Sequence, residues 1–162
     1  MDTDVTPGNF HISGAKIYID GENIGSLNQD GAIVNYNPDV HLHMSAKFGS
    51  SPVAGTVIGV EATMELHIGE TTRENLLRVL AGATEDGNKV AMGGVVGQQL
   101  TAVEVLLVPF DDTESYILHN AIPASNVEIS FSPAKEREFV VTFRGLIDVS
   151  TETIGEMGSD VS

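Results

Sequence analysis

The sequence predicts a mainly β fold: a β-sandwich or partly closed barrel with a long hairpin and one flanking α-helix. Alternation of apolar and polar residues, which is typical of half-buried strands, recurs along most of the 162-residue chain. One stretch, GETTRENLLRVLAG at residues 69–82, has instead the spacing of an amphipathic helix. Because 41% of the residues are hydrophobic, the chain can bury one sizeable core, and we expect a single domain over residues 1–162.

The N-terminal half of the chain predicts a long antiparallel hairpin. AKIYIDGENIGSL, residues 15–27, predicts a strand, a turn at Asp20-Gly21 and a second short strand. Residues 39–47 and 57–68 each have one apolar and one polar side. The polar sides consist of Asp39, His41, His43, Ser45 and Lys47 in the first segment and of Glu61, Thr63, Glu65 and His67 in the second. The connection FGSSPVAG, Phe48 to Gly55, is rich in Gly, Ser and Pro and is long enough to be mobile.

The predicted helix has about three turns. Thr71 and Glu74 have the spacing of a capping box, and Gly82 is placed to end the helix. So short a helix is not stable alone in water. We therefore expect its apolar face to cover an exposed face or edge of the sheet. That face consists of Leu76, Leu77 and Leu80.

Further strands are predicted after the helix, at residues 101–108, 115–122, 127–131 and 139–149. In the last two strands the alternation directs one set of apolar side chains inward, namely Val127, Ile129, Phe131, Phe139, Val141, Phe143 and Ile147. The ends of the chain, about residues 1–10 and 150–162, are polar or rich in Gly, and we expect them to be flexible in the monomer.

Composition restricts the possible functions. Eight Lys and Arg residues against 23 Asp and Glu residues give a net charge of −15, so tight binding of nucleic acid is not expected. The chain has no cysteine, which excludes disulfides, thiolate metal sites and a cysteine nucleophile. It has no apolar run long enough to span a membrane, and MDTDVTPGNF does not resemble a signal peptide. We therefore expect synthesis in a cytoplasm without membrane insertion.

Motifs for catalysis or cofactor binding are weak. His41 and His43 have the HxH spacing of some metal sites, with His67 as a third ligand if the hairpin register allowed it, but a solvated polar face is the simpler interpretation. GGVVGQQL lacks the order of glycines and the lysine of phosphate-binding loops. No arrangement of nucleophile, base and oxyanion hole is visible. We expect neither an enzyme nor a bound cofactor or metal.

The order of these elements resembles that of the tail tube proteins, or major tail proteins, of tailed bacteriophages. The resemblance covers about residues 12–149. It includes GAKIYIDGENIGSL, the polar-faced hairpin, SSPVAGTVIGVEATMELHIGETTRENLLRVLAG and HNAIPASNVEISFSPAKEREFVVTFRGLID. The most characteristic part is the long strand that passes directly into the predicted helix. The tube protein of type VI secretion is similar.

The resemblance implies a structural virion protein that forms stacked homo-hexameric rings, through which DNA passes on its way into the host. The polar residues of the hairpin named above are then the candidates for the lumen wall, with Lys47 pairing with an acid such as Glu61. Residues Phe48, Gly49, Ser50, Ser51, Pro52 and Val53 are the candidates for an inter-subunit loop. The loop 48–55 and both termini are expected to be disordered in the monomer and ordered in the assembly.

The same resemblance implies particular partners. These are other tail proteins, namely the tape measure, the terminator, the distal tail or baseplate and a sheath where the tail has one. Assembly would take place in the host cytoplasm, and the mature location would be the virion tail. Two alternatives remain: a terminator or distal hub ring of the same fold, and a carbohydrate-binding β-sandwich. The absence of Trp and the presence of only 3 Tyr give a sugar few aromatic surfaces on which to stack.

Overall fold

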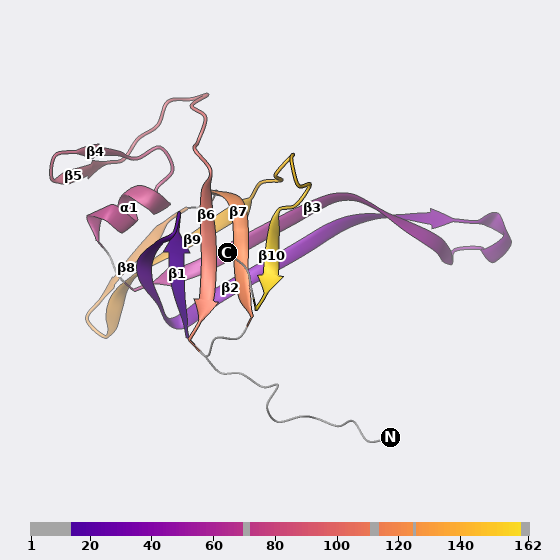
Figure 1. Cartoon of the computed structure of the whole chain (residues 1–162), viewed down its shortest axis with the longest axis horizontal. Helices are drawn as coiled ribbons and strands as arrows, with labels where there is room; N and C mark the ends of the chain where they lie inside the picture. Colours follow the sequence, from indigo (N-terminus) through magenta and orange to yellow (C-terminus); the bar gives the residue numbers. More distant parts are fainter. Residues whose placement is uncertain (1–13, 70–71, 111–113, 125, 160–162) are drawn as a thin grey trace, which may run out of the picture.

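A computed structural model describes residues 14–69, 72–110, 114–124 and 126–159. Ten strands lie in these residues: β1 (Ala15–Ile19), β2 (Glu22–Met44), β3 (Pro52–Ile68), β4 (Thr84–Asp86), β5 (Lys89–Ala91), β6 (Val103–Pro109), β7 (Ser115–Pro123), β8 (Glu128–Ser132), β9 (Lys135–Gly145) and β10 (Gly155–Gly158). They also contain one α-helix, α1 (Arg73–Val79), and a short 3-10 helix, η2 (Ala46–Phe48). The mainly β fold class predicted from the sequence is confirmed (Figure 1).

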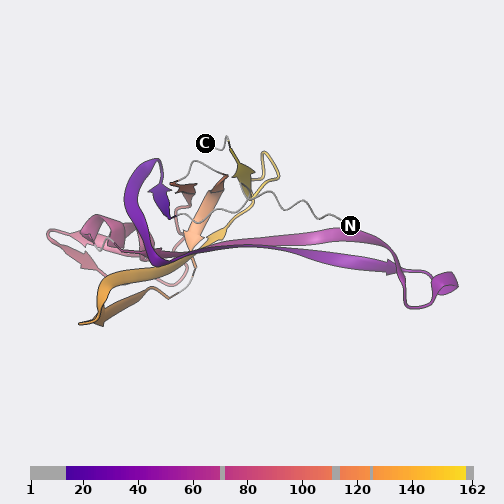
Figure 2. The same ribbon diagram turned by 90° about the horizontal axis from the view of Figure 1, so that it is seen from below.

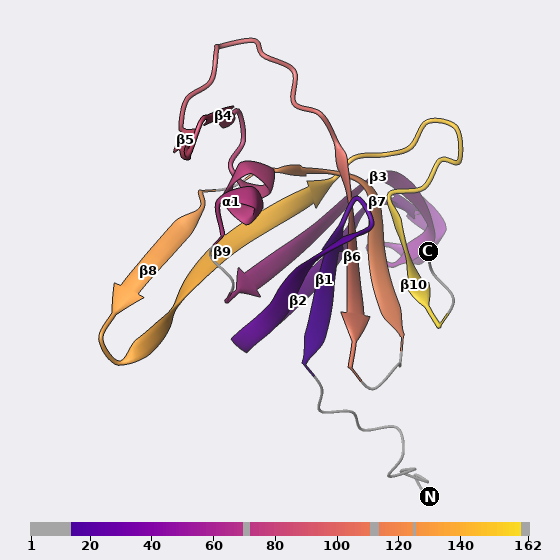
Figure 3. The same ribbon diagram turned by 60° about the vertical axis from the view of Figure 1, so that its left-hand side comes forward.

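Eight of the strands form one antiparallel sheet in the order β10-β7-β6-β1-β2-β3-β9-β8, and β4 and β5 form a separate small hairpin. The large sheet is curled, as Figure 3 shows. β7 also pairs with β9 through three residue pairs, from Ala121↔Gly145 to Pro123↔Phe143. This second pairing joins distant parts of the sheet along a short length, so the body is partly closed and is not a complete barrel.

The core fills the inside of the curled sheet. Its largest fully buried side chains come from β1, β3, β6, β7, β9 and α1: Phe139, Phe143, Ile17, Ile19, Met64, Leu66, Ile68, Ile117, Val79, Val105 and Val141. The inward alternation predicted for β9 is correct for Phe139, Val141 and Phe143. It is wrong for Phe131 and Ile147, which are exposed, because β8 ends in a turn at Ser132 and β9 already ends at Gly145.

Helix α1 is shorter than predicted and begins with a different cap. The side chain of Thr72 accepts a hydrogen bond from the backbone N–H of Asn75, while Thr71 lies outside the described residues. Val79 is fully buried, and Leu76 and Leu80 pack against the core, whereas Leu77 is half-buried. Arg78 forms an ion pair with Glu22, and Arg73 forms one with Glu85 at 3.3 Å, so the helix joins β2 and the β4–β5 hairpin.

The hairpin differs from its prediction in length and in its connection. β2 is one strand of 23 residues that joins the short strand predicted after the turn at Asp20-Gly21 to residues 39–44 of the segment predicted at 39–47, and β3 begins at Pro52. Ser45 and Lys47, which were predicted on the strand, follow its last residue, and Lys47 lies in η2. The connection between η2 and β3 is only Gly49–Ser51, since Pro52 and Val53 already belong to β3. About residues 150–162 were expected to be flexible in the monomer, but Gly155–Gly158 pair with β7 as β10.

No helix among the described residues is both long and apolar enough to cross a lipid bilayer.

Candidate assembly surface

A two-stranded ribbon projects from the body of the protein. β9 pairs with β3 only from Thr63 to Ile68, and β1 pairs with β2 only up to Ser26. Residues 33–61, which we call the arm, therefore extend beyond the neighbouring strands with β2 and β3 paired to each other alone. Figure 2 shows the arm in profile as a thin ribbon that leaves the body. An isolated two-stranded hairpin is at best marginally stable in water.

One face of the arm continues the core face of the sheet. Val34 lies opposite Met64, and Tyr36 lies opposite Ala62, and both partners are buried in the core. Residues directly opposite each other in an antiparallel pair share a face. The same face continues outward through the pairs Pro38↔Val60, Val40↔Val57, Leu42↔Gly55 and Met44↔Pro52. We call it the apolar face.

The apolar face is exposed to solvent. Leu42 has 49% of its surface exposed, and Val57 has 59%. The exposed large hydrophobic residues on this face are Val34, Tyr36, Val40, Leu42, Met44, Val57 and Val60. A continuous apolar surface of this kind on a folded protein marks a site of interaction.

The opposite face of the arm is polar, and we call it the polar face. The register places Asn35 opposite Thr63, Asn37 opposite Glu61 and His41 opposite Thr56. The Nε2 atom of His43 lies 2.8 Å from Oγ1 of Thr56. The rings of His41 and His43 meet edge to face, with their centres 5.0 Å apart. These side chains hold one another on the surface of the ribbon.

Seven of the nine predicted lumen residues share this face but occupy different parts of it, whereas Ser45 and Lys47 follow the end of β2. Asp39, His41 and His43 lie on the outer half of the arm, opposite Gly59, Thr56 and Ala54. Glu61 lies at its base, opposite Asn37. Thr63, Glu65 and His67 lie beyond it, where β3 pairs with β9. The two predicted stripes therefore follow each other along the ribbon and do not lie side by side.

The body end of the polar face is acidic. The Nε2 atom of His67 lies 3.2 Å from Glu65, and its Nδ1 atom lies 3.8 Å from Glu138. Glu61 forms an ion pair with Arg144 at 3.5 Å. The predicted pairing of Lys47 with Glu61 is wrong, because Lys47 lies at the tip, with its Nζ atom 5.4 Å from the centre of the Phe48 ring.

His67 lies too far from His41 and His43 for the three residues to bind one metal ion. Along β3, His67 is eleven residues from Thr56, the partner of His41, a separation of about 36 Å at the rise of a strand. Among residues 14–69, 72–110, 114–124 and 126–159, no group of three or more His, Asp or Glu side chains could hold a metal ion.

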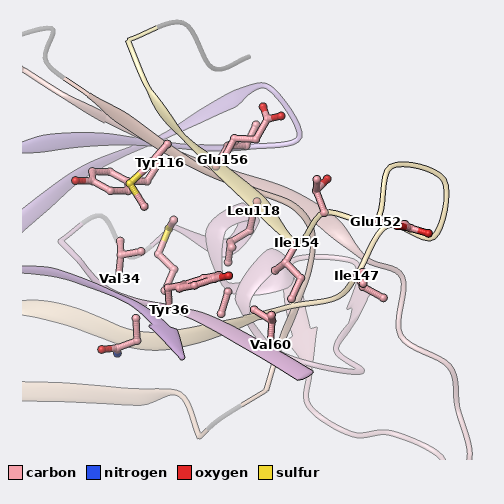
Figure 4. A pocket seen from close by; sticks show the side chains of 16 residues that line it. Val34, Tyr36, Val60, Tyr116, Leu118, Ile147, Glu152, Ile154 and Glu156 are labelled. Carbon is pink, nitrogen blue, oxygen red and sulfur yellow. The ribbon is translucent and has the colours of Figure 1, made fainter. Parts of the chain in front are cut away.

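A pocket of about 360 Å³ lies where the arm leaves the body. Figure 4 shows Tyr36 and Val60 of the arm on one side of it and Tyr116 and Leu118 of β7 on another. The remaining wall comes from the segment between β9 and β10 and from β10 itself, including Ile147, Ile154 and Met157. We call this site the arm-base pocket. Sequence analysis missed it, because β10 has no alternating pattern and because β7 and β10 reach the arm only through the curl of the sheet.

The wall after β9 is shaped by a tight turn. The carboxylate of Asp148 accepts hydrogen bonds from the hydroxyl of Ser150 at 2.6 Å and from the N–H of Ser150 at 2.8 Å. These hydrogen bonds, that of the hydroxyl first, hold the pKa of Asp148 below its ordinary value. Glu152 adopts a positive φ of 57°, which is uncommon for a residue other than glycine, and its N–H donates to the carbonyl of Asp148. The turn therefore has a defined shape at the rim of the pocket.

Comparisons with protein-family models and with curated proteins find no match for the sequence. The structure is similar to one chain of the cryo-EM structure of the anti-feeding prophage (AFP) baseplate, 6-fold symmetrised. The two chains superpose with a TM-score of 0.52 and 13% sequence identity, over 96% of this chain and 99% of that chain. The similarity is therefore one of fold over nearly the whole of both chains.

Proposed function

We propose that this chain is a structural subunit of a phage tail-type assembly, in which copies of the chain join and cover one another's arms. The observation that carries the proposal is the arm itself, with an exposed apolar face continuous with the core and an opposite polar face. A chain that functioned alone would leave this surface in water. This role needs no catalytic group and no cofactor.

Burial of the apolar face supplies the driving force for assembly. Complete burial of a Leu or Val side chain contributes roughly 1.5–3 kcal/mol, so a half-exposed side chain such as Leu42 gains about 1 kcal/mol. Several such residues on each arm offset the entropy lost when copies associate. The free backbone edges of the two-stranded ribbon can also be paired by a neighbouring copy, which removes the aggregation hazard of open edges.

A ring places the two faces of the arm in different surroundings. When the apolar faces are covered by neighbouring copies, the polar faces are left to line a central channel. The similarity to a chain of a 6-fold symmetrised baseplate supports a ring of six copies. Stacked rings would form a tail tube, with tape measure, terminator, baseplate and sheath proteins as further partners, in a particle assembled in the host cytoplasm.

The charge of the chain suits a channel for DNA. The net charge is −15, and Arg144, a cation beside the polar face, is paired with Glu61. Phosphates gain affinity mainly from Lys and Arg, so a wall with few free cations lets DNA slide without adhesion.

A single ring within a baseplate or at the distal end of a tail is the second candidate function. The similar chain belongs to a baseplate structure, which favours this candidate as much as a tube. The two candidates differ in whether rings of the purified protein stack into long tubes.

A matched pair of variants tests the proposal. Leu42 and His41 are adjacent in β2 but lie on opposite faces of the arm. Leu42→Asp places a charge on the apolar face and should raise the protein concentration needed for assembly at least tenfold, which corresponds to about 1.4 kcal/mol. His41→Asp should leave assembly within about twofold of the wild type, since that change corresponds to less than 0.5 kcal/mol.

Light scattering coupled to size-exclusion chromatography, with negative-stain electron microscopy of the same samples, measures the outcome. Rings or tubes for the wild type and His41→Asp, with monomers for Leu42→Asp, agree with the proposal. Equal assembly of both variants, or a wild type that stays monomeric at every concentration and salt, contradicts it.

A further inference from the structure

The arm-base pocket is apolar inside and acidic at its rim. Tyr36, Val60 and Ile147 are among the apolar side chains that line it. Glu152 and Glu156 also line it and are exposed to solvent. In Figure 4 the labelled carboxylates of both residues point away from the cluster of apolar side chains. An occupant with an apolar anchor beside a positive charge would match these features.

The tip of the arm carries such a group. Phe48 is 57% exposed at the end of η2, and the Nζ atom of Lys47 lies 5.4 Å from the centre of its ring. Lys47 is the only Lys or Arg in residues 33–60 of a chain with a net charge of −15. Thus an aromatic side chain and a cation lie together in η2, within the connection between β2 and β3 at the outer end of the arm (Figure 1).

A single copy cannot bring its own tip into its own pocket. Tyr36 at the base and Met44 next to the tip are paired continuously with β3, and eight residues of strand separate them by about 26 Å. The two surfaces can therefore meet only between copies.

We infer that the arm tip of one copy docks in the arm-base pocket of a neighbouring copy, with Phe48 in the pocket and Lys47 beside Glu152 and Glu156. This inference rests on the proposed assembly of the chain with itself and names one of its contacts. The two surfaces of the contact are different parts of the chain, so it is head-to-tail and can be repeated from copy to copy. Copies joined by this contact lie about one arm length apart.

Cysteine cross-linking tests the contact, because the chain has no native cysteine. Ser50→Cys places a thiol beside the tip and leaves Phe48 and Lys47 intact, and Met157→Cys places one on the pocket wall, where Met157 is 63% exposed. The two single variants are mixed under assembly conditions and treated with a bifunctional maleimide. A cross-linked dimer is expected from the mixture, and a ladder of oligomers from the double variant.

A second pair of cysteines tests whether another exposed segment, and not the arm tip, occupies the arm-base pocket. Met92 is 80% exposed in the connection between β5 and β6, another exposed apolar segment, which includes Val95 and Val96. Met92→Cys mixed with Met157→Cys should give no product above background. The inference is overturned if Met157→Cys is cross-linked to Met92→Cys in place of Ser50→Cys, or if neither pair is cross-linked in assembled samples. Either result leaves the proposed function intact. Absence of any assembly overturns both.

Charge reversal tests the role of the rim. Lys47→Glu should raise the concentration needed for assembly several-fold, and the double variant Lys47→Glu/Glu152→Lys should restore most of the loss. Lys89→Glu, in β5, makes the same charge change away from the tip and is the control. If Lys47→Glu behaves like Lys89→Glu, or the double variant is no better than the single one, Lys47 and Glu152 do not meet.

Discussion

Asn75 is a polar residue inside the core that joins α1 to β2. It is only 6% exposed, and its Nδ2 atom donates a hydrogen bond to the carbonyl of Ile24 at 2.9 Å. Because α1 has only seven residues, it depends on such tertiary contacts for its stability. The helical pattern of the sequence predicted the core contacts of Leu76 and Leu80, but it included Leu77 in that face in place of the fully buried Val79. It could not predict this bond, whose two partners are 51 residues apart.

Asn75→Ala should lower the free energy of unfolding by about 1–3 kcal/mol, because the carbonyl of Ile24 loses a buried donor. Asn37→Ala, which removes the same side chain from the exposed polar face, should change it by less than about 0.5 kcal/mol. Urea unfolding in the Leu42→Asp background, where assembly is blocked, measures both values. If both substitutions lower the free energy of unfolding equally, the side chain of Asn75 does not stabilise the packing of α1 on β2.

The lowered pKa of Asp148 predicts a pH dependence at the pocket rim. A carboxylate whose folded-state pKa is depressed stabilises the fold at neutral pH, and this stabilisation is lost as the pH falls through the lowered pKa. Ser150→Ala removes the hydroxyl donor and should raise the pKa of Asp148 toward its ordinary value. An NMR titration of the Asp148 carboxyl carbon measures the change, with Ser51→Ala at the arm tip as the control. An unchanged midpoint in Ser150→Ala would contradict the assignment.

At the scale of the elements, the alternation predicted which side chains share a face in β2 and in residues 60–68 of β3, but not beyond the register shift that places Val57 opposite Val40. It correctly separated Val40 and Leu42 from His41 and His43. It did not predict that β2 continues through residues 28–38, since Asn, Asp, Gly and Pro in that segment are typical of loops. From Ala32 to Pro38 the strand persists because every residue is paired with one of β3.

The strand β10 could not be predicted from the sequence, since its pairing depends on backbone shape. A Cβ atom at Gly155 would collide with the carbonyl oxygen of Ile117 on β7. Glycine is therefore required for β10 to approach β7 closely, and the closed wall of the arm-base pocket follows from that approach.

Gly155→Ala should displace β10 from β7 and cost about 1–3 kcal/mol of stability, as overpacking does. Hydrogen exchange of the Glu156 and Met157 amides should become faster, and the cross-link between Ser50→Cys and Met157→Cys should weaken. Gly93→Ala is the control, because a Cβ atom there meets nothing within 4 Å. Unchanged exchange in Gly155→Ala would mean that β7 and β10 tolerate the added methyl group.

At the scale of the whole molecule, the proposed passage of DNA depends on the charge of the polar face. The sequence predicted a polar hairpin face with few cations, and the structure places those residues along one surface, from His43 near the tip to His67 on the body. The position of Lys47 at the tip was not predictable, because it depends on where β2 ends.

Adding cations to the polar face should make the channel adhesive. In the variant Asn35→Lys/Asn37→Lys/Asp39→Lys we expect assemblies that retain duplex DNA, with log affinity falling against log salt by about 0.9 for each phosphate neutralised. Filter binding across a salt series measures this slope. Glu85→Lys, on the exposed β4–β5 hairpin, should leave binding near the wild-type level. Equal DNA retention by both variants would argue that the polar face does not line the channel.

The proposed assembly requires above all that other copies of this chain cover the apolar face of the arm. A cryo-EM reconstruction of the assembled wild-type protein tests it directly. We predict a ring or tube in which Val40, Leu42 and Val57 contact a neighbouring copy, while Asp39 and His41 face an open channel. A reconstruction with the arms projecting freely into solvent, or with the polar face buried and the apolar face lining the channel, would contradict the account.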